Sequence, residues 1–428
     1  MPAVLADLCI DARWIVPMTM PGKVLENHTL VVRDGRILEL LPSAAARARY
    51  AATAVVQRPT HLLLPGMVNT ATCSAMSLFR GTRSDPAALE QRFVGPEFVR
   101  DGVLAAIAEM LGSGITCFAD RYYFPEETAR TAGEQGMRAV IGMPVAETPG
   151  PWAKSSDDYL TRALRVRDEY KDHPLISSAF APHAPNTLSD ATFARIATLA
   201  DELDAGIVID LHESAAEIAA SVVLHGMRPI QRLWKLGLLT PALNAVHMTQ
   251  ATVEDIELAR RTGISISLCP QSSLKKGCGL PPLTALAASG IRLSVGSGDG
   301  APHQNQDVWG EMKLLALMSH AGAAPLPAWD ALAMATRGGA AVLGLESAVG
   351  TLEPGKWADV CCADLGGPAT SPISDPVTQL VLCGGRDIVS DVWVAGRQLL
   401  SDGETTRLDW AAVAERSNAW AERLTTGR

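Results

Sequence analysis

The sequence predicts an α/β fold, namely a (β/α)8 TIM barrel with a small β-sandwich domain formed from both termini. In the middle of the chain, eight strand-like apolar runs alternate with amphipathic helical stretches over about 285 residues. β-like sequence with short turns occurs at both ends. The 428 residues, of which 47% are hydrophobic and 19% charged, suffice for one large barrel and an appended domain.

The first 60 residues have the pattern of a β-meander. An apolar run over residues 9–16 ends at Pro17. A second run over residues 29–32 leads into the turn Asp34-Gly35, after which apolar residues resume. We therefore expect residues 1–60 to form the first part of the β-sandwich.

The barrel is expected to span residues 61–344 as the catalytic domain. Helical patterns such as those of residues 101–111 and 190–203 separate its strand-like runs. The eight expected strands cover residues 62–68, 115–119, 139–145, 175–181, 206–211, 244–247, 264–269 and 291–295.

β-like sequence returns after Gly344. Residues 345–405 are expected to complete the sandwich, because two small β segments at opposite ends of a chain are stable only when they pack together. The last segment, 406–428, contains an amphipathic pattern and is expected to form a C-terminal helix.

Charge and composition exclude several classes of function. With 37 basic and 46 acidic residues, the net charge is −9, and the absence of a Lys/Arg-rich run argues against a nucleic-acid partner. No apolar stretch approaches the roughly 20 residues that span a bilayer, and the start lacks a basic signal region. The eight cysteines show no CxxC spacing. We expect a cytoplasmic protein with a small-molecule substrate and no membrane partner.

Chemically active side chains stand at the ends of several expected strands. In a parallel barrel these ends meet at one face, so the side chains should share a site. Imidazoles and carboxylates at such a face are suited to metal-assisted or general acid–base hydrolysis. The residues are His183, His212, Glu213, His247 and Asp299.

At these residues the sequence resembles the amidohydrolase superfamily, in the branch of cytosine, guanine and S-adenosylhomocysteine deaminases and triazine hydrolases. The resemblance covers nearly the whole chain, and it is carried by residues 64–70, 106–111, 114–116, 269–275 and 350–359. It implies a homodimer. It also implies a role for each strand-end residue: His212 as a metal ligand, Glu213 as proton shuttle, His247 as the imidazole touching the attacking water, Asp299 as ligand and base, and His183 as a substrate contact.

The first strand departs from the family pattern. Where the family has Asn-Thr-His-Xaa-His, this chain has Asn-Thr-Ala71-Thr72-Cys73, so the HxH metal motif is replaced. Ala71 has no donor atom, whereas the thiolate of Cys73 is a possible zinc ligand. The candidate ligands are then His212, Asp299 and Cys73, and the cofactor is either none or one divalent metal ion, Zn or Fe.

The remaining candidates concern substrate binding. Cys73 lines the expected cavity in either case, and Tyr123 belongs to a Tyr-Tyr-Phe triplet suited to packing on a planar ring. His303 stands where the family often has a small polar residue. The pair Lys275-Lys276 adds positive charge at the mouth of the site.

The expected function is hydrolysis of a C–N bond, other than a peptide bond, in a small, planar, nitrogen-containing compound, by a deaminase-like enzyme with a degenerate metal site. Two alternatives remain open at this point. The first is a metal-independent hydrolase or lyase that uses Glu213, His247 and Asp299. The second is a ligand-binding pseudoenzyme without catalysis.

Overall fold

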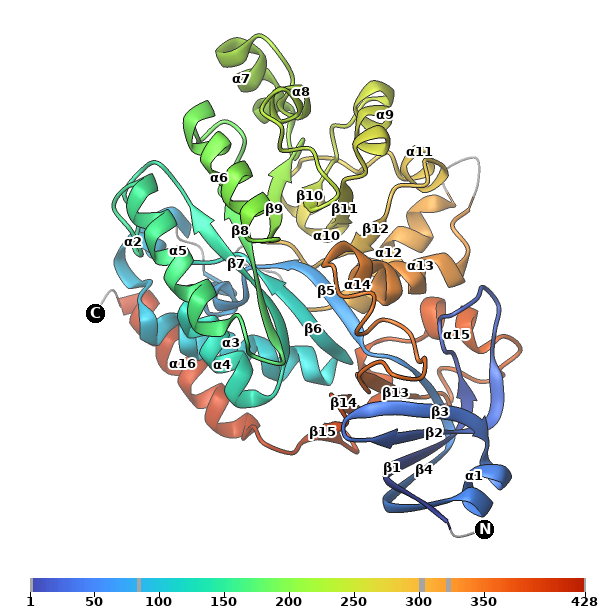
Figure 1. Cartoon of the computed structure of the whole chain (residues 1–428). Helices are drawn as coiled ribbons and strands as arrows, with labels where there is room; N and C mark the ends of the chain where they lie inside the picture. The colour runs from blue at the N-terminus through green and yellow to red at the C-terminus, as the bar shows by residue number, and fades with distance from the viewer. Residues whose placement is uncertain (1–2, 83–85, 300–304, 321–324, 427–428) are drawn as a thin grey trace.

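The structure is a computed structural model that describes residues 3–82, 86–299, 305–320 and 325–426. Two sheets organise the chain, and Figure 1 shows them as an upper barrel and a lower sheet near the N-terminus. Both sheets have eight strands. None of the helices in the described ranges is long and apolar enough to cross a membrane.

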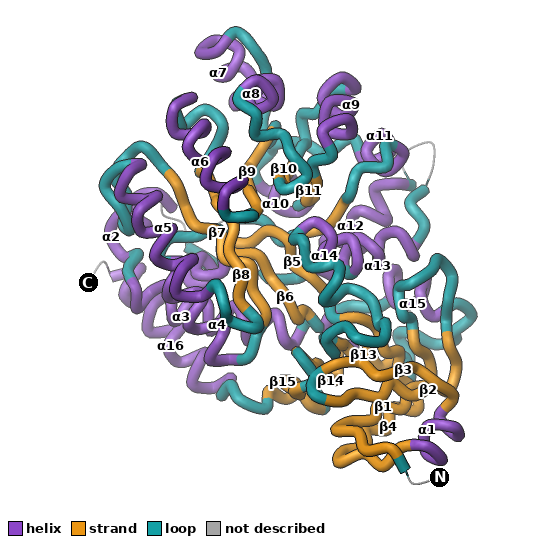
Figure 2. Tube along the Cα trace, in the orientation of Figure 1, coloured by secondary structure: helices purple, strands orange, loops and turns teal. Residues whose placement is uncertain are grey.

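The barrel consists of parallel strands in sequence order, with helices around them (Figure 2). A parallel bridge between Thr72 and Gly298 connects its first and last strands, and the Thr70 hydroxyl donates to the carbonyl oxygen of Val295. The strands are β5 (Met67–Thr72), β6 (Ile115–Asp120), β7 (Arg138–Val145), β8 (Ile176–Pro182), β9 (Gly206–Leu211), β10 (Leu243–His247), β11 (Ser265–Leu268) and β12 (Leu293–Val295).

Helices follow most barrel strands and bury their apolar faces against them. The helices up to β9 are η1 (Ser74–Phe79), α2 (Pro86–Phe93), α3 (Pro96–Gly112), α4 (Pro125–Gln135), α5 (Ser156–Tyr170) and α6 (Asp190–Glu202). Those after β9 are α7 (Ala215–His225), α8 (Pro229–Lys235), α9 (Val253–Thr262), α10 (Pro270–Lys275), α11 (Leu283–Ala288), α12 (Val308–Ser319), α13 (Ala328–Ala335) and α14 (Arg337–Val342).

The second sheet is mixed and combines both ends of the chain. Its order is β16-β15-β14-β13-β4-β1-β2-β3, in which β4 pairs parallel with β1 and antiparallel with β13. The N-terminal elements are β1 (Val4–Ile15), β2 (Leu25–Arg33), β3 (Arg36–Pro42), α1 (Ser43–Arg49) and β4 (Tyr50–Pro65). The C-terminal elements are β13 (Val360–Asp364), α15 (Pro376–Cys383), η2 (Arg386–Ile388), β14 (Val389–Val394), β15 (Arg397–Ser401), β16 (Glu404–Thr405) and α16 (Trp410–Thr426).

The predicted fold class is thus confirmed, and one strand differs. The run expected at residues 62–68 divides at Gly66, because β4 ends at Pro65 in the terminal sheet and β5 begins at Met67 in the barrel. The Gly66 N–H donates to the carbonyl oxygen of Asp359, and a Cβ at Gly66 would lie 2.1 Å from the Thr116 side chain. Glycine is therefore required where the chain passes from one sheet to the other. The domain division at residues 60, 344 and 405 stays a prediction.

The polar contacts that fix the C-terminal part of the chain to the barrel include a buried ion pair and a buried hydrogen bond. Arg138 of β7 binds Asp359 through two hydrogen bonds of 2.7 and 3.1 Å, with both side chains buried. The Trp420 indole of α16 donates to Asp101 of α3 at 3.0 Å, and Figure 1 shows the two helices side by side.

Candidate active site

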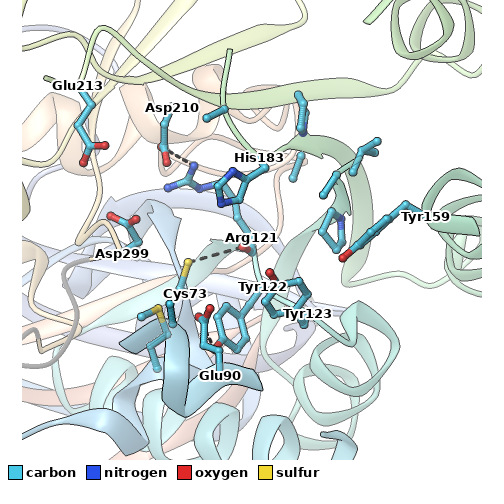
Figure 3. Close-up of a pocket in the computed structure, with 18 of the residues that line it drawn as sticks. Cys73, Glu90, Arg121, Tyr122, Tyr123, Tyr159, His183, Asp210, Glu213 and Asp299 are labelled. Carbon is cyan, nitrogen blue, oxygen red and sulfur yellow. Dashed lines mark hydrogen bonds and ion pairs between the residues drawn. The ribbon is translucent and has the colours of Figure 1, made fainter. Parts of the chain in front are cut away.

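A cavity of about 570 Å³ opens at the C-terminal ends of the barrel strands. This volume is within the range of small-molecule sites. One wall is ionic and the opposite wall is aromatic, as Figure 3 shows. The chemically active side chains of the lining are Cys73, Glu90, Arg121, Tyr122, Tyr123, Tyr159, His183, Asp210, Glu213, Glu217, Lys276 and Asp299.

The strand ends bring Glu213, His247 and Asp299 together. One ligand-capable atom of each lies within 4.8 Å of the others, and among the described residues this is the group that could hold a metal ion. His247 Nε2 is 3.4 Å from Glu213 Oε1 and 3.9 Å from Asp299 Oδ1. This nitrogen is buried and has no hydrogen-bond partner among the described residues, whereas Nδ1 lies 3.3 Å from the Ser273 hydroxyl. The nitrogen also lies 3.7 Å from Asp210 Oδ1, and a buried ring nitrogen that faces three carboxylates without a hydrogen bond is a feature of a binding site.

Lys276 lies directly between the two carboxylates. Its Nζ is 2.8 Å from Glu213 Oε1 and 2.6 Å from Asp299 Oδ1, and its side chain is 30% exposed. Burial would lower the pKa of Lys276, but the charges of Asp299, Glu213 and Asp210 outweigh it and raise the pKa above its ordinary value. Burial raises the pKa of Asp299, and the cations, with Lys276 first, more than reverse this. Both partners are therefore ionised at neutral pH.

A second cation, Arg121, follows β6. Its Nη1 donates to Asp210 Oδ1, and the side chain is only 7% exposed (Figure 3). The Nε and Nη2 atoms are buried and have no hydrogen-bond partner in the described parts of the chain. Because a guanidinium buried with unused donors is costly, these two groups are available to a ligand in the cavity.

His212 lies apart from this cluster, so the structure does not bring it together with Asp299 and Cys73, and its role as a metal ligand stays a prediction. Its Nε2 accepts the Ile230 N–H at 3.1 Å, and its Nδ1 lies 3.3 Å from Asp255 Oδ2. Burial lowers the pKa of His212 against the opposing effect of Asp255. The backbone φ of +53° at His212 turns the chain, so that Glu213 lines the cavity while His212 packs toward α8.

Cys73 lines the cavity just after β5. Its thiol donates to the carbonyl oxygen of Arg121 at 3.6 Å (Figure 3). Burial is the main cause that raises the pKa of Cys73 well above the ordinary value, so the side chain is a neutral thiol. Ala71, two residues earlier, is completely buried and contributes only a methyl group.

The expected substrate contacts lie on the other side of the cavity. The Tyr122 hydroxyl donates to Glu90 at 2.8 Å, and the Tyr122 and Tyr123 rings are 5.3 Å apart in an edge-on arrangement. His183 lines the cavity in an exposed position, with Nδ1 3.4 Å from the Thr187 hydroxyl. His303 lies outside the described residues.

Sequence reasoning assigned no role to Asp210, Arg121 or Glu217, and it treated Lys276 only as charge at the mouth. Asp210 could have been found, because it lies at the end of an expected strand, and the strand ends of a parallel barrel meet at one face. Glu217 accepts the N–H groups of His212 at 3.1 Å and Glu213 at 2.7 Å, and burial, against these bonds, raises its pKa to about 7. The sequence signal for Glu217 was its position three residues after Ser214, which is the spacing of a helix cap and the residue that pairs with it at the start of α7.

Comparison with known proteins identifies the family. Residues 62–399 match the model of the amidohydrolase family. A protein of Teredinibacter turnerae, named 5-methylthioadenosine/S-adenosylhomocysteine deaminase, is 40% identical over 431 residues that cover 98% of each chain.

Solved structures agree with this result. An adenosine deaminase from Xanthomonas campestris, crystallised with bound zinc, shares 39% identity with a TM-score of 0.97, covering 99% of this chain and 100% of that one. A mutant atrazine chlorohydrolase from Arthrobacter aurescens shares the fold, with a TM-score of 0.89 at 22% identity over 96% of this chain and 99% of that one. The chain belongs to the amidohydrolase family and is a hydrolase of C–N bonds other than peptide bonds.

Proposed function

We propose that this enzyme deaminates a 6-aminopurine nucleoside, with 5-methylthioadenosine, S-adenosylhomocysteine and adenosine as the candidate substrates. The names of the relatives support this substrate class. The observation that carries the proposal is that Glu213 and Asp299, which lie beside His247, line a cavity whose opposite wall holds Tyr122 and Tyr123. Aromatic side chains pack well against the planar ring of a purine.

In the proposed reaction, water attacks the ring carbon that bears the amino group. A C–O bond forms, the C–N bond breaks, and ammonia leaves, so no oxidant or reductant is needed. His247 Nε2 and Asp299 orient the water and accept its proton, and Glu213 carries a proton to the leaving nitrogen. His247 Nε2 lies 3.4 Å from Glu213 and 3.9 Å from Asp299, so the three groups are close enough to act on the same water molecule.

Substrate recognition is proposed to divide between the two walls. The rings of Tyr122 and Tyr123 contact the purine, and Cys73 lies beside it as a neutral thiol. His183, at the exposed side of the cavity, contacts the ribose or its 5′ substituent. The two unused donors of Arg121 bind an acceptor atom of the substrate.

The amidohydrolase family typically uses a divalent metal, and the Xanthomonas campestris relative was crystallised with zinc. A catalytic zinc site needs three protein ligands at about 2.0–2.3 Å. Glu213, His247 and Asp299 supply three donors, but Lys276 Nζ lies 2.8 and 2.6 Å from two of them and fills the space between them. With Lys276 in this position the residues do not fit a divalent ion, so the proposed steps use side chains alone.

The proposal is tested by incubating the purified protein separately with the three candidate nucleosides. Conversion of the 6-amino to the 6-oxo purine changes the ultraviolet absorbance, and ammonia release is measured in parallel. We expect one product and one ammonia per substrate consumed, and turnover by Glu213→Gln that is lower by about 10²–10⁴-fold. Unchanged nucleosides after long incubation with folded protein would contradict the proposed substrate class.

We also propose a homodimer, as the resemblance implied. Exposed apolar side chains gather on α7 and α8, where Val223 is 83% and Trp234 52% exposed. Light scattering after size-exclusion chromatography is expected to give twice the chain mass, and Val223→Asp is expected to reduce it. A wild-type mass equal to one chain would contradict this assembly. The expected cytoplasmic location stays a prediction.

A further inference from the structure

We propose that the ammonium group of Lys276 is the resident cation of the active site and holds the place between Glu213 and Asp299 that a divalent metal ion would require. This inference goes beyond the proposed function, and it is independent of the substrate. In this proposal, a side chain of the protein, and not a bound metal ion, supplies the positive charge between the two carboxylates.

The first support is the position of the ammonium group. Nζ is within hydrogen-bond distance of one oxygen from each carboxylate, at 2.8 Å from Glu213 and 2.6 Å from Asp299. These two oxygens, with His247 Nε2, are the atoms of the possible metal site. A metal ion bound to the same oxygens would come too close to Nζ, because both cations need the same lone pairs.

The second support is the backbone that presents this lysine. Lys276 directly follows α10, and its N–H donates to the carbonyl oxygen of Ser272 at 3.0 Å. The chain then turns at Gly277, with a φ of +68°, and the Cys278 N–H donates to Ser273. Gln250 Nε2 donates to the Cys278 carbonyl oxygen at 2.6 Å. Since hydrogen bonds on both sides of Lys276 hold the loop, its side chain enters the cavity from a fixed base.

The third support is the set of neighbouring side chains that could bind a metal ion. At the end of β5, Ala71 offers no ligand atom, and the Cys73 thiol donates to the carbonyl oxygen of Arg121. At the end of β9, Asp210 is paired with Arg121. Metal affinity depends on deprotonated, unpaired ligands. The strand ends therefore supply few side chains that could bind a metal ion. The Lys276 ammonium group competes with a metal ion for the two carboxylates that could do so, those of Glu213 and Asp299.

The role of Lys276 in the reaction follows from its charge. Its ammonium group binds Asp299 at 2.6 Å and Glu213 at 2.8 Å, and it so fixes both carboxylates beside His247 Nε2. A single positive charge lowers the pKa of water less than a divalent ion does. We therefore expect a slower enzyme that keeps its activity when metal is removed.

The test measures metal binding to the full-length protein without substrate, so its failure is distinguishable from failure of the proposed substrate class. Wild-type protein, Lys276→Met and Lys275→Met are dialysed against a chelator, analysed for metal by mass spectrometry, and titrated with zinc in a calorimeter. Lys275 is the matched control, because it precedes Lys276 and is not among the described residues that line the cavity.

We expect no stoichiometric zinc in the wild-type protein or in Lys275→Met. Lys276→Met is expected to bind zinc at least about tenfold more tightly, because its three donors become free, which corresponds to about 1.4 kcal/mol. Lys276→Arg keeps the positive charge, and we expect it to remain zinc-free; this variant serves if Lys276→Met fails to fold. One tightly bound zinc in the wild-type protein would overturn the proposal. Equal zinc affinities of folded wild-type protein and Lys276→Met would also overturn it.

Discussion

Two of the buried ionic groups among the described residues differ in how completely their polar atoms are paired. The Arg138–Asp359 pair, between the barrel and the terminal sheet, forms two mutual hydrogen bonds, and Asp359 also accepts the Ala395 N–H at 2.7 Å. In the cavity, by contrast, His247 Nε2 and two Arg121 nitrogens find no partner among the described residues. Complete pairing stabilises the fold, whereas unpaired atoms around a cavity indicate a ligand.

The largest effect is expected from changing the proton carrier of the cavity cluster. Glu213→Gln keeps the size of the side chain but removes its ability to accept a proton. We expect kcat to fall about 10²–10⁴-fold, which is the usual contribution of general acid–base catalysis. Steady-state deamination kinetics measure the effect, with circular dichroism as the control for folding. Full kcat in a folded Glu213→Gln variant would remove Glu213 from the proposed mechanism.

A substitution in the Arg138–Asp359 pair should instead lower the free energy of unfolding. Arg138→Met leaves Asp359 buried without its cation, and we expect a loss of about 3–5 kcal/mol in the free energy of unfolding. Urea denaturation measures this loss. The activity per folded molecule should stay unchanged, because Arg138 is not among the described residues of the cavity. A fall in kcat with unchanged stability would contradict the assignment of this pair to the fold.

A smaller effect is expected at Arg121. Arg121→Lys keeps a positive charge beside Asp210 but removes the forked donors that face the cavity. Loss of a hydrogen bond from a charged group, of about 1.5–3 kcal/mol, should lower kcat/KM by about 10–100-fold. We expect the change mainly in KM, as measured by initial rates. An unaltered KM would show that the unused donors of Arg121 do not contact the substrate.

The smallest effect is expected at Lys275, the neighbour of Lys276. We expect Lys275→Met to change the free energy of unfolding by less than about 0.5 kcal/mol, as is usual for exposed positions. Its kcat should equal that of the wild-type enzyme. If Lys275→Met lowered kcat as much as Lys276→Met does, either substitution would disturb the whole loop. The position of the Lys276 ammonium group would then not be the cause of the effect.

Much of the fold was predictable, because strand periodicity is local. The eight runs gave the barrel strands within a few residues, apart from the division at Gly66, which depends on a close contact with Thr116 from a distant segment. The convergence of Glu213, His247 and Asp299 was predictable too, since parallel strand ends meet at one face.

The features of the site that could not be predicted have equally local causes. The resemblance implied His212 as a metal ligand, which stays a prediction, but a left-handed backbone conformation there turns its ring toward Ile230 and Asp255. The sequence carries no signal of that φ angle at a histidine. The reach of Lys276 into the cavity depends on where α10 ends and how Gly277 turns the chain, and neither is legible from a pair of lysines.

The central claim is that the cavity works with Lys276 as its cation. The most direct measurement is the turnover of 5-methylthioadenosine by wild-type protein after chelator treatment, with zinc and iron determined by mass spectrometry on the same sample. We predict undiminished turnover with metal far below one ion per chain. Turnover that disappears with the metal and returns when zinc is added would contradict the claim.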